Sequence, residues 1–462
     1  MKDQDNRTSE LCKFLMGLKF DDIPESTLER TKDLLLDHLG VALLSSQLPW
    51  TRIVREQMRL SSGRAESTVY GCNQKMDRRA AALINGTAAH GIELDDTHNA
   101  SFSHPGAVVI ATAMSVAEAE GRSGRELLAS IVAGYEAQGR AGAAASGALG
   151  RGFHPTAAAG VFGATAACAH LGAMESSSLE SAFGLAASAA SGVMQFAEDP
   201  EGNMIKRLHG GLPAMNGILM AELAKAGFKG PRAALDGRFG FVSVFGGGGD
   251  CMRITRDLGR VWEIDQISVK LYACCRHFHS AIDALRACLR EAQVSSDDIE
   301  WIDVFLTPIA LDGRLQYRPK SVMAAQYSLP YAMAATVLLD PQNPSSFSEE
   351  AVARPALVGL MDRVRGHADQ LLEKYLPEQF PANVCVSLRD GRKFSRMLPD
   401  SIGTPGFPLD RDGVVSKFDS LVGKSADHDW GTQLKEEVLS IDRAPDLSRL
   451  TKILRRASFA DV

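Results

Sequence analysis

The sequence predicts a mainly α protein, with a large all-helical domain and a smaller α+β lid domain. Three observations lead to this prediction. The chain has 462 residues, more than a single hydrophobic core usually supports. Helix-start patterns recur through the first part of the chain, and strand-like runs appear only after about residue 266. Helical patterns return near residue 400, so we expect a helical domain from 1–265 plus 400–462 and a lid domain from 266–399.

Helices in the first domain are predicted where a Ser stands three residues before a Glu, ahead of an apolar run, because such pairs cap helix starts. The pairs are Ser26 with Glu29, Ser123 with Glu126, and Ser177 with Glu180. Ala and Gly are dense from 141 to 192. Since small residues let helices approach closely, we expect this stretch at the centre of a helical bundle rather than across a membrane.

The lid domain is predicted from strand and turn signals. The run 301–306 is strand-like, and 384–388 is followed by an Asp-Gly turn and Lys393-Phe394. Asp-Gly between alternating runs is a strong hairpin signal, because this turn needs positive φ. Helices are expected at 279–292 and 351–366, which makes this domain α+β.

Composition excludes several classes of protein. The net charge of -6 and pI near 6.0 argue against nucleic acid as a partner. The N-terminus lacks an apolar segment, and the eight cysteines show no CxxC spacing, as expected for a cytoplasmic protein with reduced thiols. No P-loop, HExxH or GxSxG motif is present.

Titratable residues gather between residues 90 and 106. The segment holds His90, Glu93, Asp95, Asp96, His98 and His104. Clustered carboxylates repel, which raises the pKa of at least one of them and suits general acid/base work. Two alternatives stay open: a solvated helix end capped by Asp96 or Thr97, and a divalent metal site built from Asp and His.

Two further segments precede predicted helices. His154 stands just before the Ala/Gly-rich helix, where backbone N–H groups form an anion site, although a plain capping role is also possible. Lys206, Arg207 and His209 stand before a helix expected from about 213 to 226. Cations at such a position favour a receptor for a carboxylate. The alternative is that Lys206 and Arg207 are simply exposed on a loop.

The proposed domain junction supplies the last candidates. Cys275 could act as a nucleophile or acid if Arg276 or a histidine such as His279 lowers its pKa, but a buried, inert Cys is the alternative. The uncharged aromatic patch around Tyr331 could close a pocket or belong to the core.

These segments, in this order, resemble the MmgE/PrpD family. The resemblance covers nearly the whole chain and is carried by Asp37-His38-Leu39-Gly40, Asn85-Gly86-Thr87-Ala88-Ala89-His90, Phe153-His154-Pro155, Lys206-Arg207-Leu208-His209 and the Tyr331 patch. The family includes 2-methylcitrate dehydratases, cis-aconitate decarboxylases and an iminodisuccinate epimerase. The resemblance implies a large helical domain, a smaller α+β lid, a cleft between them, a homodimer and no cofactor. We also expect no stoichiometric metal ion.

The resemblance also implies site positions. By motif, those of the decarboxylases become Glu93, His104, His154, Lys206 and Cys275. Glu93 stands where an Asp is usual, and Cys275 where the decarboxylases carry His. The pairing of Cys275 with His279 looks more like the epimerase branch.

We therefore expect proton removal next to a carboxylate of a small di- or tricarboxylic acid, most simply by a dehydratase or decarboxylase. Epimerisation by the same step is the alternative, followed by a non-catalytic carboxylate-binding role and a metal-dependent hydrolase. The developing charge needs nearby cations and donors. The expected catalytic residues are Glu93, Asp96, His104, His154, Lys206 and Cys275, and the expected substrate-binding residues are Asp95, Arg207, His209, His279 and Tyr331.

Overall fold

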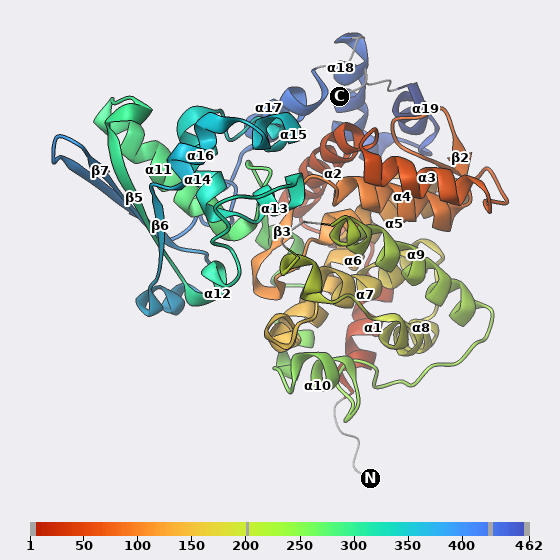
Figure 1. Cartoon of the computed structure of the whole chain (residues 1–462). Coiled ribbons are helices and arrows are strands. Elements are labelled where there is room, and N and C mark those ends of the chain that lie inside the picture. Colours follow the sequence, from red (N-terminus) through yellow and green to blue (C-terminus); the bar gives the residue numbers. More distant parts are fainter. Residues whose placement is uncertain (1–5, 200–202, 424–427, 457–462) are drawn as a thin grey trace.

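The computed structural model describes residues 6–199, 203–423 and 428–456. Helices dominate, and the one sheet of more than two strands in these residues lies in a separate, smaller lobe (Figure 1). The predicted mainly α fold with a small α+β part is confirmed. Among the described residues, no helix is both long and apolar enough to cross a membrane.

The large lobe is a bundle of helices from the first part of the chain. Its helices are α1 (Arg7–Gly17), α2 (Glu25–Ser45), α3 (Pro49–Arg59), α4 (Arg78–Ala89), α5 (Pro105–Glu120), α6 (Gly124–Ala144), α7 (Pro155–Leu171), α8 (Ser176–Ala189), α9 (Ile205–Lys225) and α10 (Phe241–Gly246). Two short ribbons pair β1 (Ser67–Thr68) with β2 (Lys75–Met76), and β3 (Thr97–His98) with β4 (Ile267–Ser268).

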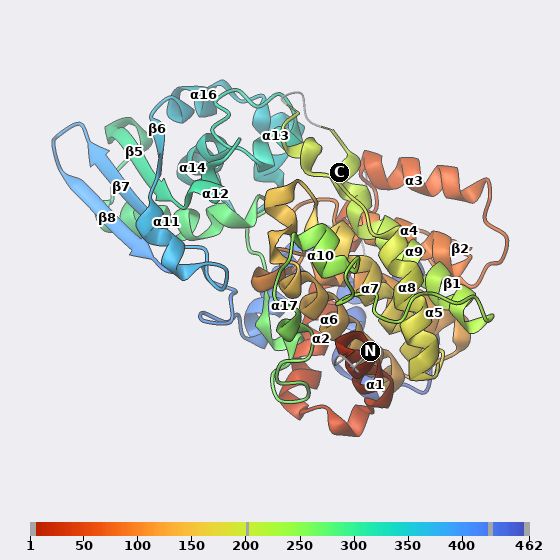
Figure 2. The ribbon, with the colours of Figure 1, turned by 90° about the horizontal axis from the view of Figure 1, so that it is seen from below.

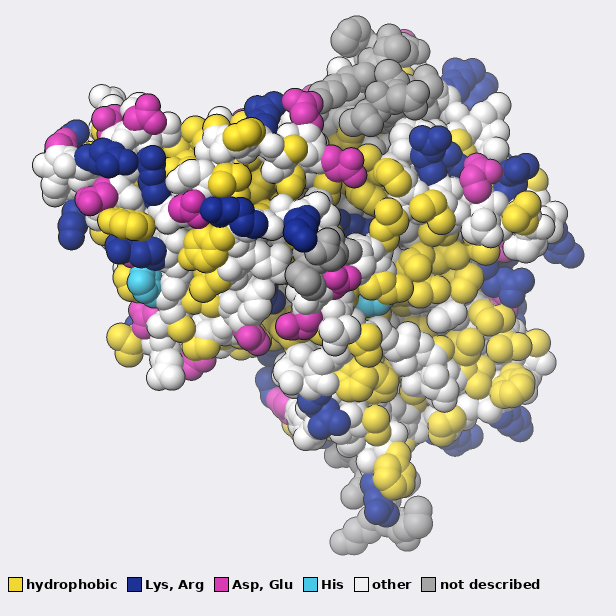
Figure 3. Space-filling view, viewed as in Figure 1, with side chains coloured by type: hydrophobic (Ala, Val, Ile, Leu, Met, Phe, Trp, Pro, Cys, Tyr) yellow, Lys and Arg dark blue, Asp and Glu magenta, His cyan; other side chains and the backbone are white. Residues whose placement is uncertain are grey.

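Helix α7 forms the centre of the bundle, as the Ala/Gly-rich stretch predicts. All its residues except His170 are buried, and it packs against α5, α6, α8 and α9. The small side chains leave room for four helical neighbours, since helix axes come closest where the contact residues are small. On the face shown in Figure 3, exposed hydrophobic side chains gather over α3, α4 and α9.

One of the three predicted capping boxes is confirmed. Ser123 and Glu126 cap α6 reciprocally. The box at Ser26 is wrong, because α2 begins two residues earlier, at Glu25 with Pro24 as its N-cap. Glu29 instead pairs with Lys32 and Arg411. The box at Ser177 is also wrong: α8 follows Glu175, and Glu180 accepts a hydrogen bond from the Ser9 hydroxyl of α1.

The smaller lobe is built on a four-stranded sheet with the order β6-β5-β7-β8, visible at the left of Figures 1 and 2. Strand β5 runs parallel to β6 and antiparallel to β7, and β7 pairs antiparallel with β8. Helix α11 packs on β7 and β8, and α14 on β6. The elements are α11 (His279–Ala292), β5 (Ile299–Leu306), α12 (Pro308–Leu311), α13 (Val322–Gln326), α14 (Leu329–Leu338), α15 (Glu349–Val352), α16 (Pro355–Met361), β6 (Val364–Ala368), β7 (Ala382–Leu388) and β8 (Lys393–Leu398).

The strand at 301–306, the helix at 279–292 and the Asp-Gly hairpin are confirmed, and Gly391 has the positive φ that the turn needs. The single helix expected at 351–366 is wrong. Helix α15 ends at Val352, α16 starts afresh at Pro355, and residues 364–366 belong to β6. A proline cannot continue the preceding helix but suits the first turn of a new one.

The C-terminal segment returns to the large lobe. It forms α17 (Arg411–Val422), α18 (His428–Leu439) and α19 (Ser448–Arg456). Helices α17 and α18 pack on α2, and α19 lies against β1. The Arg411 guanidinium ties α17 to α2 through ion pairs of 2.7 Å with Glu29 and Asp33.

Candidate active site

The segment between α4 and α5 forms the centre of the site. His90 ends α4 as its C-cap, and His104 precedes α5 as its N-cap. Between them the chain is irregular until β3 pairs with β4, which brings Lys270 beside the segment. Glu93 adopts a left-handed φ of 58°, a conformation that non-glycine residues rarely take.

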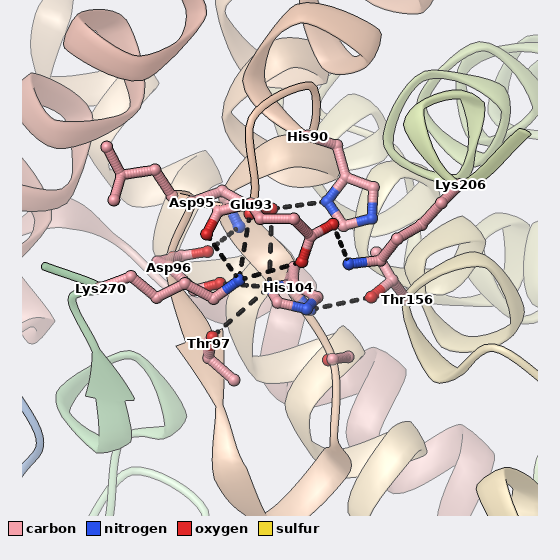
Figure 4. A network of polar contacts seen from close by, with 12 residues as sticks. His90, Glu93, Asp95, Asp96, Thr97, His104, Thr156, Lys206 and Lys270 are labelled. Carbon is pink, nitrogen blue, oxygen red and sulfur yellow. Dashed lines mark hydrogen bonds and ion pairs between the residues drawn. The ribbon is translucent and has the colours of Figure 1, made fainter. Parts of the chain in front are cut away.

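Three cations converge on the Glu93 carboxylate (Figure 4 labels two of them, Lys206 and Lys270). Lys206 pairs directly with Oε1, Arg207 Nη1 lies 3.1 Å from the same oxygen, and Lys270 Nζ lies 3.6 Å from Oε2. All four side chains are almost completely buried. Burial raises the pKa of Glu93, but the three cations outweigh it and hold that pKa well below its usual value. Glu93 is therefore ionised.

Lys206 and Arg207 lie inside α9, not before it. The expected helix start at Pro213 is wrong, because α9 begins at Ile205 and continues through the proline. The first-turn position still suits the predicted role, since free N–H groups at a helix start favour anions near these two cations.

A second carboxylate, Asp95, is held by histidines. His90 Nδ1 lies 2.6 Å and His104 Nδ1 3.6 Å from Asp95 Oδ2, and Lys270 Nζ lies 3.7 Å from Oδ1. Burial raises the pKa of Asp95, but His104, His90 and Lys270 more than offset it, so the pKa falls well below the usual value.

His104 has a defined tautomer. Its Nδ1 lies 2.8 Å from the carbonyl oxygen of Asp96, which can only accept, so Nδ1 carries the proton and Nε2 keeps its lone pair. His90 also carries its proton on Nδ1, because this atom faces the Asp95 carboxylate, which is an acceptor. Burial lowers the pKa of both imidazoles, which are therefore neutral at pH 7.

His154 and His209 form a second pair of imidazoles. Their Nδ1 atoms are 2.9 Å apart, so one ring donates and the other accepts. His154 is the N-cap residue of α7, as predicted, and its ring centroid lies 6.5 Å from that of His104. Burial, reinforced by neighbouring positive groups, lowers the pKa of His154 and brings that of His209 to about 3.

Asp96 has different partners from Glu93 and Asp95. Its carboxylate accepts hydrogen bonds from the Gly106 N–H of α5 (2.9 Å) and the Tyr135 hydroxyl (2.6 Å). Asp96 thus caps the start of α5, which matches the capping alternative for this segment, except that the helix end is buried and not solvated. Burial raises the pKa of Asp96 to about 7.

Cys275, His279 and Tyr331 lie in the smaller lobe. The Cys275 N–H donates to the Gln326 carbonyl. Tyr327, the residue after Gln326, has its ring centroid 5.2 Å from Lys206 Nζ. The His279 ring packs on Tyr272, with Nε2 3.4 Å from the Cys274 carbonyl. The Tyr331 hydroxyl donates to the Ser346 carbonyl and its ring packs on Phe347. The described contacts of His279 and Tyr331 thus lie within the lobe's own core.

Sequence reasoning missed three members of the site. Lys270 contacts both Glu93 and Asp95, His90 contacts Asp95, and Gln326 accepts from Arg207 Nη2 at 2.7 Å. Each stood in or beside a quoted segment, but the sequence does not show that the short β3–β4 pairing brings Lys270 to Glu93.

A divalent cation fits the cluster poorly. Ligand atoms of His90, Asp95 and His104 lie within 4.8 Å of one another, so the geometry is available. However, the Lys270 ammonium already lies beside Asp95, and Lys206 is also close to these groups. Three basic side chains, Lys206, Arg207 and Lys270, face the two carboxylates Glu93 and Asp95, which gives an excess of one formal positive charge (3 − 2). The arrangement favours an anion.

Comparison with known proteins identifies the family. Residues 9–253 match the MmgE/PrpD N-terminal domain, and residues 272–443 match the MmgE/PrpD C-terminal domain. The chain belongs to the MmgE/PrpD family. The predicted boundary at 265–266 falls between the two matched ranges, and Lys270 stands at the end of the intervening segment.

Relatives of this MmgE/PrpD protein match over nearly their whole lengths. The cis-aconitate decarboxylase-like protein oryM of Aspergillus oryzae is 29% identical, with 97% of each chain covered. The cis-aconitate decarboxylase of Aspergillus terreus is 28% identical over 97% of this chain and 95% of its own. The human cis-aconitate decarboxylase is 27% identical over 98% of this chain and 96% of its own. Two of these relatives are named as decarboxylases, which are lyases, and the third as decarboxylase-like.

Proposed function

We propose that this MmgE/PrpD protein is a cofactor-independent enzyme that removes a proton next to a carboxylate of a small di- or tricarboxylic acid, most simply as a lyase. The observation that carries the proposal is the convergence of Lys206, Arg207 and Lys270 on one buried carboxylate, beside imidazoles with free lone pairs. A receptor that already binds the carboxylate of Glu93 has the chemistry to bind a substrate carboxylate.

The charge balance supports an anionic substrate. The excess positive charge of the buried cluster is costly in a medium of low polarity, and a bound carboxylate offsets it. When a proton leaves the carbon next to that carboxylate, negative charge grows on the carboxylate oxygens. Lys206, Arg207 and Lys270 would stabilise this charge without reorganising, because Glu93 and Gln326 already hold two of them in place.

We assign the general base to His104. Its Nε2 carries the lone pair, and its lowered pKa keeps it neutral at pH 7. Glu93 and Asp95 are poorer bases because their pKa values are lowered, and Asp96 is occupied by Gly106 and Tyr135. Asp95, which lies 3.6 Å from His104, would stabilise the imidazolium after proton transfer.

The fate of the carbanion decides the reaction class. Loss of a β-hydroxide from the carbanion would give a dehydratase. In a decarboxylase the allylic carbanion would instead form by loss of CO2, without prior proton removal, and would then be protonated. The names of the relatives favour a lyase. Epimerisation is the second candidate, favoured by the 6.5 Å separation of the His104 and His154 rings, since two imidazoles could serve opposite faces of one carbon.

Proton NMR in D2O tests the proposal. Purified enzyme is incubated with citrate, 2-methylcitrate, cis-aconitate, itaconate and aspartate-derived diacids, with and without EDTA. Deuterium incorporation into a dehydrated or decarboxylated product would support a lyase, and exchange with inversion would support an epimerase. Absence of exchange across the panel, or its loss with EDTA, would contradict the proposal. A His104→Gln variant is the control for exchange that does not arise at the site.

A further inference from the structure

The irregular segment 92–96 is anchored by side chains from four other places in the fold. Gln326 Nε2 donates to the Ile92 carbonyl at 3.0 Å, and Lys270 Nζ to the Glu93 carbonyl at 3.2 Å. Lys417 Nζ donates to the Leu94 carbonyl at 2.9 Å, and His104 Nδ1 to that of Asp96 at 2.8 Å. Such anchoring supplies partners that a helix or strand would otherwise provide.

Lys417 reaches the segment from the C-terminal helix α17. Its ammonium lies 2.6 Å from Asp37 Oδ1 of α2, and both side chains are buried. Gly40, one turn along α2, permits this approach: a Cβ there would lie 3.0 Å from Cδ2 of Phe418. Asp37 and Gly40 belong to a sequence motif that the proposed chemistry leaves unused.

We propose that Lys417, oriented by Asp37, is a positioning residue that holds the backbone between Glu93 and Asp95. The inference rests on the proposed function, because it assigns Lys417 to the same site. Lys417 makes no described contact with the Glu93 or Asp95 side chains, so it would act through the Leu94 carbonyl alone.

The backbone geometry explains why such an anchor would matter. Glu93 keeps its left-handed φ only if the surroundings fix it, since this conformation is unfavourable for a non-glycine residue. Lys270 and Lys417 hold two consecutive carbonyls from different sides of the fold. A shift of about 1 Å in reacting groups can slow turnover about 100-fold, so loss of one anchor should reduce kcat.

The test compares three variants of the full chain. Lys417→Met removes the donor to Leu94 but leaves Asp37 buried and unpaired, which destabilises. The double variant Asp37→Asn/Lys417→Met also removes the lone charge. Arg411→Met is the matched control, because it breaks another tie between α17 and α2 without touching the segment.

We expect the double variant to recover thermal stability while kcat stays about 10- to 100-fold below wild type, with KM changed less than about threefold. Amide hydrogen exchange of peptide 90–98 should accelerate in both Lys417 variants and not in Arg411→Met. Recovery of both stability and kcat in the double variant, or unchanged exchange in that peptide, would overturn the inference. Because the exchange measurement needs no substrate, it decides the matter even if the wild type proves inactive and the proposed function fails.

Discussion

Lys206 is the residue on which the proposed chemistry depends most directly. Lys206→Met removes a buried ammonium while Arg207 and Lys270 still pair with Glu93, so the fold should persist. Because that ammonium would stabilise charge that is largest in the transition state, we expect kcat/KM to fall on the order of 100-fold or more. Steady-state kinetics with the substrate identified by NMR measure this. Lys225→Met, at the exposed end of the same helix, is the control, and activity within about threefold of wild type in Lys206→Met would refute the role.

The loss of activity at low pH should report the protonation of the general base, His104. Burial lowers the pKa of His104 below its ordinary value of 6.5, and the neutral imidazole is the active form. Activity should therefore be retained at pH 6 and lost only as pH falls further, when His104 takes up a proton. The pH dependence of kcat/KM measures this directly. An acid limb centred above pH 7 would point to another base.

Sequence segments predicted most members of the cluster but not the direction of each side chain. Glu93, His104, His154, Lys206, Arg207 and His209 come together in one buried site. Asp96 stands one residue from Asp95, yet it turns to α5 and Tyr135. Adjacent residues of an irregular segment point differently, and only the tertiary structure shows which of them faces the cations.

At the scale of elements, the contact between α4 and α9 sets the position of the cations. A Cβ at Gly211 would lie 2.1 Å from the Leu83 carbonyl oxygen of α4, so Gly211→Ala must push the two helices apart. We expect a loss of about 1–3 kcal/mol in the free energy of unfolding and a marked loss of activity, since Lys206 and His90 lie on these two helices. Thermal unfolding and kinetics measure both.

Gly359→Ala is the matched control for this substitution. Gly359 lies within helix α16, and a Cβ there would have open space around it. The alanine should leave activity unchanged and stabilise slightly, because glycine is a poor helix former. Equal effects of the two substitutions would mean that the close α4–α9 approach does not position the site.

Local signals predicted elements where the local preference and the tertiary environment agree. The Asp-Gly turn sets the β7–β8 hairpin because the backbone there needs positive φ. The start of α9 was missed because Pro213 is a strong local start signal, whereas packing against α4 and α7 extends the helix back to Ile205. Glu180 shows the same competition, since it bonds Ser9 of α1 and not its own helix start.

At the scale of the whole molecule, the site is assembled from every part of the chain. Five parts of the chain contact one another there: the segment after α4, the start of α9, Lys270, Gln326 in the smaller lobe and Lys417 in the C-terminal segment. Periodicity and composition predict the two parts of the fold, but not this convergence, because contacts between residues hundreds of positions apart leave no local pattern.

Burial of neutral histidines should make the whole protein sensitive to acid. Seven histidines are buried with lowered pKa values, namely His38, His90, His104, His154, His209, His277 and His279. Below pH 6.5 these histidines become protonated in the unfolded chain but stay neutral in the folded protein. The free energy of unfolding therefore decreases as the pH is lowered. Carboxyl groups whose pKa is raised by burial act in the opposite direction. The pKa rises to about 7 in Asp96 and Glu136, and it is also raised in Asp33, Asp37, Glu222, Asp265 and Asp283.

The expected result is a Tm that falls steadily from pH 7 to pH 5 in calorimetry at a fixed scan rate. His38 lies apart from the proposed chemistry, and burial lowers its pKa to about 3. Each such histidine contributes about 1.4 kcal/mol per pH unit once the pH is well below 6.5, so His38→Leu should make the decline shallower. A decline that is equally steep in His38→Leu and in the wild type would mean that His38 takes up its proton in the folded state as well.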